Sequence, residues 1–129
     1  MKLAKTGGVY YNKAKQYEKA AKLFLEENLF NEAAESYELS GNIDDAVSLY
    51  IKGNNHEKAA GILRRKGDVK KAALIEAEGL TESGDDLKAV KYYQEAGEFA
   101  KAGDIYRNLQ EHEKAGMMFE KAREYSLAS

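Results

Sequence analysis

Residues 31–54, NEAAESYELSGNIDDAVSLYIKGN, contain one short pattern twice. In each copy an alanine follows an acidic residue, and a tyrosine comes four places later. The pairs are Ala33 with Tyr37 and Ala46 with Tyr50, so the second copy begins 13 residues after the first. An internal repeat of fixed length indicates that the chain is built from equivalent structural elements.

The repeat extends over nearly the whole chain. The alanine that opens each copy recurs as Ala20, Ala33, Ala46, Ala59, Ala72, Ala89, Ala102 and Ala115. Every gap is 13 residues except the 17 between Ala72 and Ala89. A further step of 13 back from Ala20 reaches Gly7, in TGGVYY, where glycines replace the alanine pair. The sequence therefore predicts nine repeats, at residues 2–14, 15–27, 28–40, 41–53, 54–66, 67–83, 84–96, 97–109 and 110–122.

Each repeat is expected to form one short helix. If its positions are numbered from 1, with the marked alanine at position 6, apolar residues fall at positions 3, 6, 7 and 10, which is one stripe of a helix. The helices are expected to end at Gly41, Gly53, Gly67, Gly84 and Gly97, because glycine accepts the left-handed conformation. The polar residues Asn42, Asp68 and Asp85 are expected to cap the helices that follow.

Helices this short are marginal in water alone, so they must pack on their neighbours. The small residues at positions 6 and 7 allow close approach of the helices, and the bulky residue at position 10 fills the space beside them. We expect an all-α fold, an α-solenoid of about nine short antiparallel helices stacked as hairpins, in one domain over residues 1–129. Ala46→Leu is expected to overpack this core, whereas Glu38→Lys is expected to cost little.

The repeat at residues 67–83 has four additional residues, and Glu76 occupies its position 10, where other repeats have an aromatic residue or leucine. Two interpretations stay open. A longer helix absorbs the insertion, or the insertion changes the local curvature and shapes a groove for a partner.

Composition excludes several classes of protein. The chain has no cysteine, so it has neither a disulfide framework nor a thiolate metal site. The start, MKLAKTGGVYY, lacks the apolar run of a signal peptide, and no stretch approaches the roughly 20 apolar residues of a membrane span. A pI near 5.8 argues against nucleic-acid binding. We expect a cytoplasmic protein with no membrane insertion.

Three segments, YEKAAKLF, KAVKYYQEAGEFAKAGDIY and EKAGMMFEKA, resemble tetratricopeptide-type helical repeats. In that family a small residue and an aromatic residue four places later hold a helical hairpin together, as Ala89 and Tyr93 would here. A tetratricopeptide repeat has 34 residues, whereas two of these repeats make 26, and the tryptophan and terminal proline of the family are absent. The short rhythm is also similar to the helical-hairpin solenoids of vesicle-coat and ciliary-transport subunits. The resemblance implies a right-handed superhelix that binds peptides or other proteins.

No motif for catalysis is found. His56 and His112 both occupy position 3, where other repeats have Tyr17 or Phe30, so a packing or half-buried role is expected. The carboxylates alternate with lysines in the manner of solvated helix faces, and the glycines of AKTGGVYY lack the spacing of a phosphate-binding loop. GNIDDAVS lacks the ligand spacing of an EF-hand. We expect no enzymatic activity, no metal and no cofactor.

The strongest surface feature is the basic segment ILRRKGDVKKAA. Tetratricopeptide domains that capture acidic peptide tails use Lys, Arg and Asn side chains, and two asparagines precede this segment. Tyrosine also suits recognition where it reaches the surface. The candidate partner-binding residues are Asn54, Asn55, Arg64, Arg65, Lys66, Lys70, Lys71, Tyr10 and Tyr92.

Three functional hypotheses follow from these observations. The first is a scaffold or adaptor module that binds a peptide or protein partner, with an acidic one expected. The second is structural self-assembly end to end, because neither end shows a polar capping helix; alternatively, the chain is a slice of a longer repeat protein. The third is a sensor or regulatory segment of a larger multidomain protein.

Overall fold

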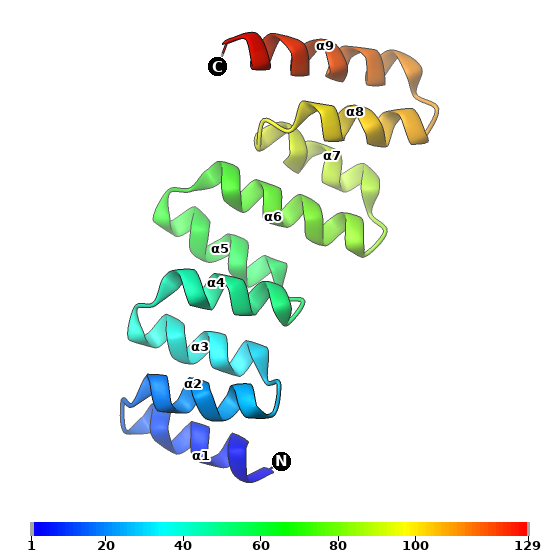
Figure 1. Ribbon diagram of the computed structural model, residues 1–129. Helices are drawn as coiled ribbons and strands as arrows, with labels where there is room; N and C mark the ends of the chain where they lie inside the picture. Colours follow the sequence, from blue (N-terminus) through cyan, green and yellow to red (C-terminus); the bar gives the residue numbers. More distant parts are fainter. Residues whose placement is uncertain (1, 129) are drawn as a thin grey trace. The chain divides into compact units, whose positions relative to one another are not determined.

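A computed structural model describes residues 2–128 of the chain, and all regular secondary structure in these residues is α-helical (Figure 1). Nine helices lie within this range: α1 (Lys2–Lys13), α2 (Tyr17–Glu26), α3 (Phe30–Ser40), α4 (Ile43–Lys52), α5 (His56–Lys66), α6 (Val69–Glu82), α7 (Asp86–Glu95), α8 (Phe99–Asn108) and α9 (His112–Ala128). The predicted all-α fold with one helix in each repeat is confirmed.

The helices begin at the same position of the repeat. Each helix from α2 to α9 starts at position 3, at Tyr17, Phe30, Ile43, His56, Val69, Asp86, Phe99 and His112. In all eight, the backbone N–H of the marked alanine donates to the carbonyl of position 2 at 2.9–3.2 Å. The alanine that marks the repeat in the sequence therefore also closes the first turn of its helix.

The turns between the helices share one conformation. Position 1 has a positive φ at Lys15, Asn28, Gly41, Asn54, Gly67, Gly84, Gly97 and Gln110. The next N–H donates to a carbonyl five residues back at 2.7–2.9 Å in every turn. This is the Schellman arrangement, which satisfies carbonyls that the end of a helix leaves unpaired.

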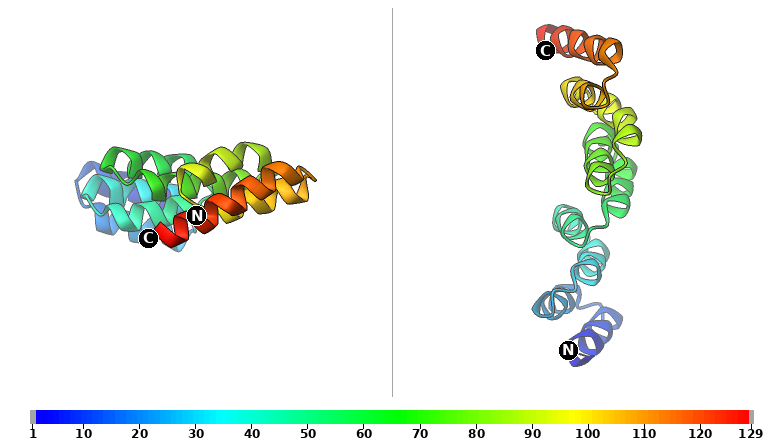
Figure 2. Two further views of the ribbon diagram at one scale, coloured as in Figure 1. Left: turned by 90° about the horizontal axis from the view of Figure 1, so that it is seen from above. Right: turned by 90° about the vertical axis from the view of Figure 1, so that its right-hand side faces the viewer.

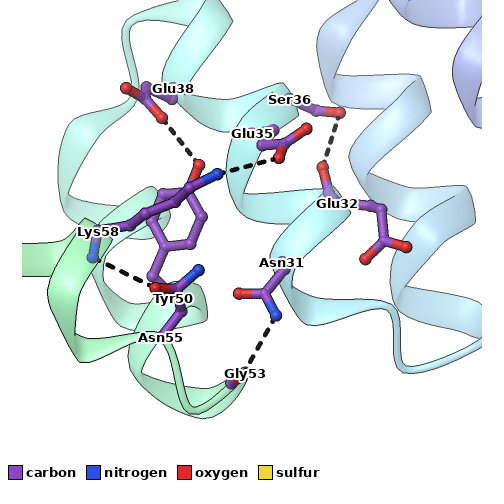
Figure 3. Close-up of polar contacts among 9 residues, drawn as sticks. All are labelled: Asn31, Glu32, Glu35, Ser36, Glu38, Tyr50, Gly53, Asn55 and Lys58. Atoms are coloured by element: carbon purple, nitrogen blue, oxygen red, sulfur yellow. Dashed lines mark hydrogen bonds and ion pairs between the residues drawn. The ribbon is translucent and has the colours of Figure 1, made fainter. Parts of the chain in front are cut away.

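One predicted glycine role is wrong. Gly53 has φ −80°, and Asn54 takes the left-handed conformation instead, with φ 58°. Asparagine tolerates this conformation because its short polar side chain causes little steric cost. Gly53 is needed for a different reason: a Cβ there would lie 2.7 Å from Asn31 Oδ1, and Asn31 Nδ2 donates to the Gly53 carbonyl at 3.2 Å (Figure 3).

The predicted side-chain caps at Asn42, Asp68 and Asp85 are also wrong. These residues occupy the N-cap position but make no side-chain cap hydrogen bond. Their ψ angles of 56–77° differ from the extended backbone of a typical capping residue, so the side chain does not reach the amides of the first turn. Asn55 does cap its helix, since the Lys58 N–H donates to Asn55 Oδ1 at 3.3 Å.

The chain divides into two compact units, Met1–Ile62 and Leu63–Ser129, and α5 contributes residues to both. In the first unit, α1 packs on α2, α2 on α3 and α3 on α4. The right-hand view of Figure 2 shows α1 and α3 on one side of this unit and α2 and α4 on the other. In the second unit α6, α7, α8 and α9 pack consecutively. Each unit thus shows solenoid-like stacking, while the handedness and the single domain stay predictions.

The marked alanines form the centre of the packing, as predicted. All of them are fully buried except Ala115, which is 5% exposed. In the first unit, Ala20, Ala21 and Ala33 form a cluster around the ring of Phe24. In the second unit the corresponding cluster includes alanines of α6, α7 and α8. Small residues at these positions therefore permit the close helix contacts that hold each unit together.

The bulky residue at position 10 is matched in size to position 7 of the preceding helix. The two phenylalanines at position 10, Phe24 and Phe119, face glycines 16 residues earlier. A Cβ would lie 2.4 Å from the Phe24 ring at Gly8 and 2.9 Å from the Phe119 ring at Gly103. Gly8 and Gly103 are therefore sites of close packing.

Position 11 of one helix contacts position 10 of the next. Tyr50 is 1% exposed, and its hydroxyl donates to Glu38 Oε1 at 2.9 Å (Figure 3). Arg107 and Phe119 occupy the same two positions of their repeats, and the Arg107 guanidinium lies 6.0 Å from the centre of the Phe119 ring. The prediction that Glu38→Lys is nearly neutral rested on an exposed carboxylate, but Glu38 is half-buried and hydrogen-bonded, so that premise is wrong.

The long repeat forms a long helix, as one of the two interpretations predicted. Helix α6 has 14 residues, whereas its neighbours α5 and α7 have 11 and 10. The same helix contains Ala77, which is fully buried and belongs to the core of the second unit. The alternative of a groove for a partner stays a prediction.

Candidate partner-binding surface

The basic segment lies at the end of α5 and the start of α6, around the turn at Gly67. Arg65, Lys66, Lys70 and Lys71 are exposed there. The structure thus places four of the five predicted basic side chains at the surface of the second unit.

Arg64 differs from them because its guanidinium is held within the fold. Arg64 Nε donates to Glu76 Oε1 at 2.8 Å and Nη2 to Glu76 Oε2 at 3.1 Å. Nη2 and Nη1 also donate to the two carboxylate oxygens of Glu95 at 2.8 and 3.4 Å. One arginine therefore joins α5, α6 and α7 through two bidentate ion pairs.

These contacts shift the pKa values of Arg64 and Glu95. Hydrogen bonds that the Arg64 guanidinium donates to Glu76 and, with a smaller effect, to Glu95 hold its pKa above the usual value. The hydrogen bond from Arg64 likewise lowers the pKa of Glu95. The charges in this ion-pair network, Arg64 with Glu76 and Glu95, are therefore stabilised by one another, which favours a structural role.

Lys70 contacts Tyr125 on the last helix, α9. Its ammonium donates to the Tyr125 hydroxyl at 2.8 Å and lies 5.3 Å from the centre of the same ring. Tyr125 in turn packs edge-on against Phe99, with ring centres 5.6 Å apart. The Lys70 side chain thus joins α6 to α9 inside the second unit.

Asn54 and Asn55, the two asparagines predicted to bind a partner, lie in the first unit, where they stabilise the turn between α4 and α5 and the start of α5. Asn54 is exposed and takes the left-handed turn conformation. Asn55 is half-buried and caps α5 through its side-chain oxygen. The Lys58 ammonium beside this cap lies 3.5 Å from Glu35 Oε1 on α3, as Figure 3 shows.

The two predicted tyrosines have different surroundings. Tyr10 on α1 is 64% exposed, and Lys13 Nζ lies 5.2 Å from the centre of its ring. Tyr92 is half-buried and packs against the core of the second unit. Of the pair, Tyr10 presents the larger surface to a partner.

Other lysines lie over tyrosine rings at a fixed spacing. A lysine at position 5 covers the tyrosine at position 10 of the preceding helix in four places, at 5.7–5.9 Å from the ring centre: Lys19 on Tyr11, Lys58 on Tyr50, Lys101 on Tyr93 and Lys114 on Tyr106. These cation–π contacts, each between residues eight apart in the sequence, contribute to packing between consecutive helices.

Sequence reasoning missed two residues of these networks. Glu95 lies 31 residues from Arg64, and no repeated spacing connects them. Tyr125 lies beyond the nine repeats, on the part of α9 that continues past residue 122. The Arg64–Glu76 contact could have been found, because its 12-residue separation is the same as that of Glu38 and Tyr50.

The histidines do not behave alike. His56 is buried, in agreement with the packing role expected at position 3, whereas His112 is exposed, so the expectation of a packed or half-buried residue is wrong there. His112 is the first residue of α9. Within residues 2–128, no group of three or more His, Asp or Glu side chains is arranged to hold a metal ion.

The fold defines the class of protein, an all-α helical repeat with short helices packed on their sequence neighbours. Protein-family models give no match to the chain, and comparison with curated proteins gives no significant one. No helix within residues 2–128 has the length and apolar character needed to cross a membrane.

Proposed function

We propose that the protein is a non-catalytic interaction module, a scaffold or adaptor that binds a protein or peptide partner on the outer surface of its helices. The observation that carries this proposal is the contrast between constant inner and variable outer positions. Position 6 is alanine in eight repeats and buried in all of them. Position 8 is exposed in six repeats, where it holds Val9, Lys22, Glu35, Ser48, Lys91 and Met117.

This contrast favours recognition over a repeated structural contact. A polymer built from equivalent repeats would gain from equivalent outer surfaces, whereas a surface that differs at each helix suits one specific partner. The ionised side chains with shifted pKa values, Arg64 and Glu95, are paired with each other, which supports a structural role for both.

Binding of labelled peptides tests the proposal. Fluorescence anisotropy of an acidic, a neutral and a basic peptide, each titrated with the full chain, is expected to show binding of the acidic peptide. Weaker binding by Arg65→Glu, with unchanged circular dichroism, would assign a contribution to the basic segment. Absence of binding for all three peptides would contradict the interaction-module proposal.

Self-association is the second candidate, and exposed apolar side chains on α1 favour it. Leu3 and Val9 are both exposed there. Contacts between such faces would bury apolar surface and join copies of the chain. The mass of the protein in solution separates this candidate from the first.

A further inference from the structure

Helix α1 has an exposed apolar stripe opposite its packed face. Leu3 is 85% exposed, Tyr10 64% and Val9 41%. Leu3 and Tyr10 are separated by two helical turns and lie on one side of the helix, with Val9 at the edge of that side. The packed side contains Gly8, which contacts the Phe24 ring, and Asn12, whose Oδ1 accepts a hydrogen bond from Ser36 at 2.9 Å.

The same helix is strongly basic. Helix α1 contains three lysines and the turn after it a fourth, Lys15; residues 2–17 have no acidic residue, and the first carboxylate in the sequence is that of Glu18. Lys5 Nζ lies 3.7 Å from Glu32 Oε2, and because the lysine is exposed and the carboxylate only half-buried, the pair is weak. Lys13 lies over the Tyr10 ring at the border of the apolar stripe. Apolar and cationic side chains thus occur together on one exposed helix face.

We propose that this outer face of α1, defined by Leu3, Val9, Tyr10 and Lys13, docks an acidic amphipathic helix of a partner protein. The inference rests on the proposed function and gives it a site and a partner class. Apolar side chains of the partner helix pack around Leu3 and Val9, and its flanking carboxylates pair with Lys13 and Lys5. Tyr10 supplies a large ring and a hydroxyl group, a combination suited to an interface that is partly wet.

The geometry favours a protein helix over an anionic membrane surface, although both offer negative charge. Membrane binding by an amphipathic helix increases with the apolar area that it inserts. Helix α1 has 12 residues and is held against α2, so the exposed side chains of Leu3, Val9 and Tyr10 supply only a small area. A partner helix of similar length covers this small area with a complementary surface.

A synthetic peptide tests the assignment. The probe is a fluorescein-labelled amphipathic helix of about 18 residues, with leucines on one face and glutamates beside them. Its matched control has lysine in place of every glutamate. The full chain is expected to bind the acidic probe at least about tenfold more tightly than the basic one, and added salt should weaken the binding.

Variants of exposed residues locate the site without disturbing the core. Leu3→Asp and Tyr10→Ala are each expected to weaken binding of the acidic probe about tenfold or more, with unchanged circular dichroism. Leu87→Asp, a change of another exposed leucine on α7, is the matched control and should leave the affinity unchanged.

Several outcomes would overturn the assignment, and they are distinguishable from failure of the proposed function. Loss of acidic-probe binding in Arg65→Glu but not in Leu3→Asp would move the site away from α1 and leave the interaction module standing. Binding of phosphatidylserine-containing vesicles with the same dependence on Leu3, without binding of the probe, would make α1 a membrane-binding surface. A complex containing two chains would assign the face to a second copy. Failure of acidic, neutral and basic peptides alike would contradict both proposals.

Discussion

At the scale of single residues, the two units depend on size matching between a glycine and an aromatic ring. Gly103 lies against Phe119, and a Cβ at Gly103 would be 2.9 Å from that ring. Gly116 lies on the next helix, and a Cβ there would meet nothing within 4 Å. Both glycines lie within helices, but only Gly103 has no room for a Cβ, whereas Gly116 has open space around it.

Substitution of these glycines by alanine should therefore have opposite effects. Gly103→Ala is expected to destabilise the fold by about 1–3 kcal/mol, because the Phe119 ring must shift. Gly116→Ala is expected to stabilise it by up to about 1 kcal/mol, because alanine is the better helix former. Urea denaturation of both variants checks the prediction, and a destabilised Gly116→Ala would count against it.

The buried hydrogen bond of Tyr50 makes the charge at Glu38 important. Glu38→Lys removes the acceptor of the Tyr50 hydroxyl and is expected to cost about 1–2 kcal/mol. Glu26→Lys, at an exposed position on α2, should change stability by less than about 0.5 kcal/mol. Equal free energies of unfolding for the two variants would show that the hydrogen bond contributes nothing.

These residue contacts were only partly predictable from the sequence. The buried alanines follow from the period, because a small residue at a fixed place must face a neighbour. The sequence did not predict that Asn54, rather than Gly53, takes the left-handed conformation, because the position of Gly53 depends on Asn31, which lies on another helix. Glu38 looked like a solvated carboxylate because nothing local shows that Tyr50 approaches it.

At the scale of the helix, the alanine at position 6 sets the distance between neighbouring helices. Ala102 and Ala100 lie on the same helix, α8, but Ala102 is fully buried and Ala100 is exposed. Ala102→Leu is expected to destabilise the fold by about 1–3 kcal/mol, as is Ala46→Leu, through overpacking.

Ala100, the exposed alanine of α8, provides the control. Ala100→Leu should change the free energy of unfolding by less than about 0.5 kcal/mol, since leucine is also a good helix former. Thermal denaturation of the two leucine variants of α8 measures the difference. Similar melting temperatures would mean that position 6 does not set the helix spacing.

The Arg64 network links three helices and should depend on pH. The pKa of Glu95 is lowered in the fold, so its contribution is present above the unfolded pKa of about 4.3 and is lost as the pH falls through the lower folded value. Glu95→Gln is expected to show a smaller loss of stability between about pH 6 and pH 3 than the parent chain. The effect should be modest, because both side chains are partly exposed.

A second variant distinguishes the ion pair from a general effect of acid. Arg64→Met should show a similarly reduced pH dependence, and the double variant should show no further reduction. Independent, additive effects of the two substitutions would contradict the network. The ion-pair network was predictable only in part. The sequence showed that Glu76 is unusual at position 10, but nothing in it indicated that Glu95 on α7 also contacts Arg64.

At the scale of the whole molecule, the fold class was predictable because the repeat is regular. Eight helices start at position 3 of the repeat and eight turns have a positive φ at position 1, so the repeat period determines the secondary structure of most of the chain. The predicted site was less accessible to such reasoning. The exposure of Tyr10 and the engagement of Arg64 and Lys70 depend on neighbouring helices, which a local charge pattern does not describe.

The central claim is that the helices stack within one chain and leave their outer faces for a different partner. Light scattering over a series of concentrations measures whether the protein stays a single chain. A constant mass of one chain, 14.4 kDa, is expected. A mass that rises with concentration would contradict the central claim and would assign the outer faces to contacts between copies.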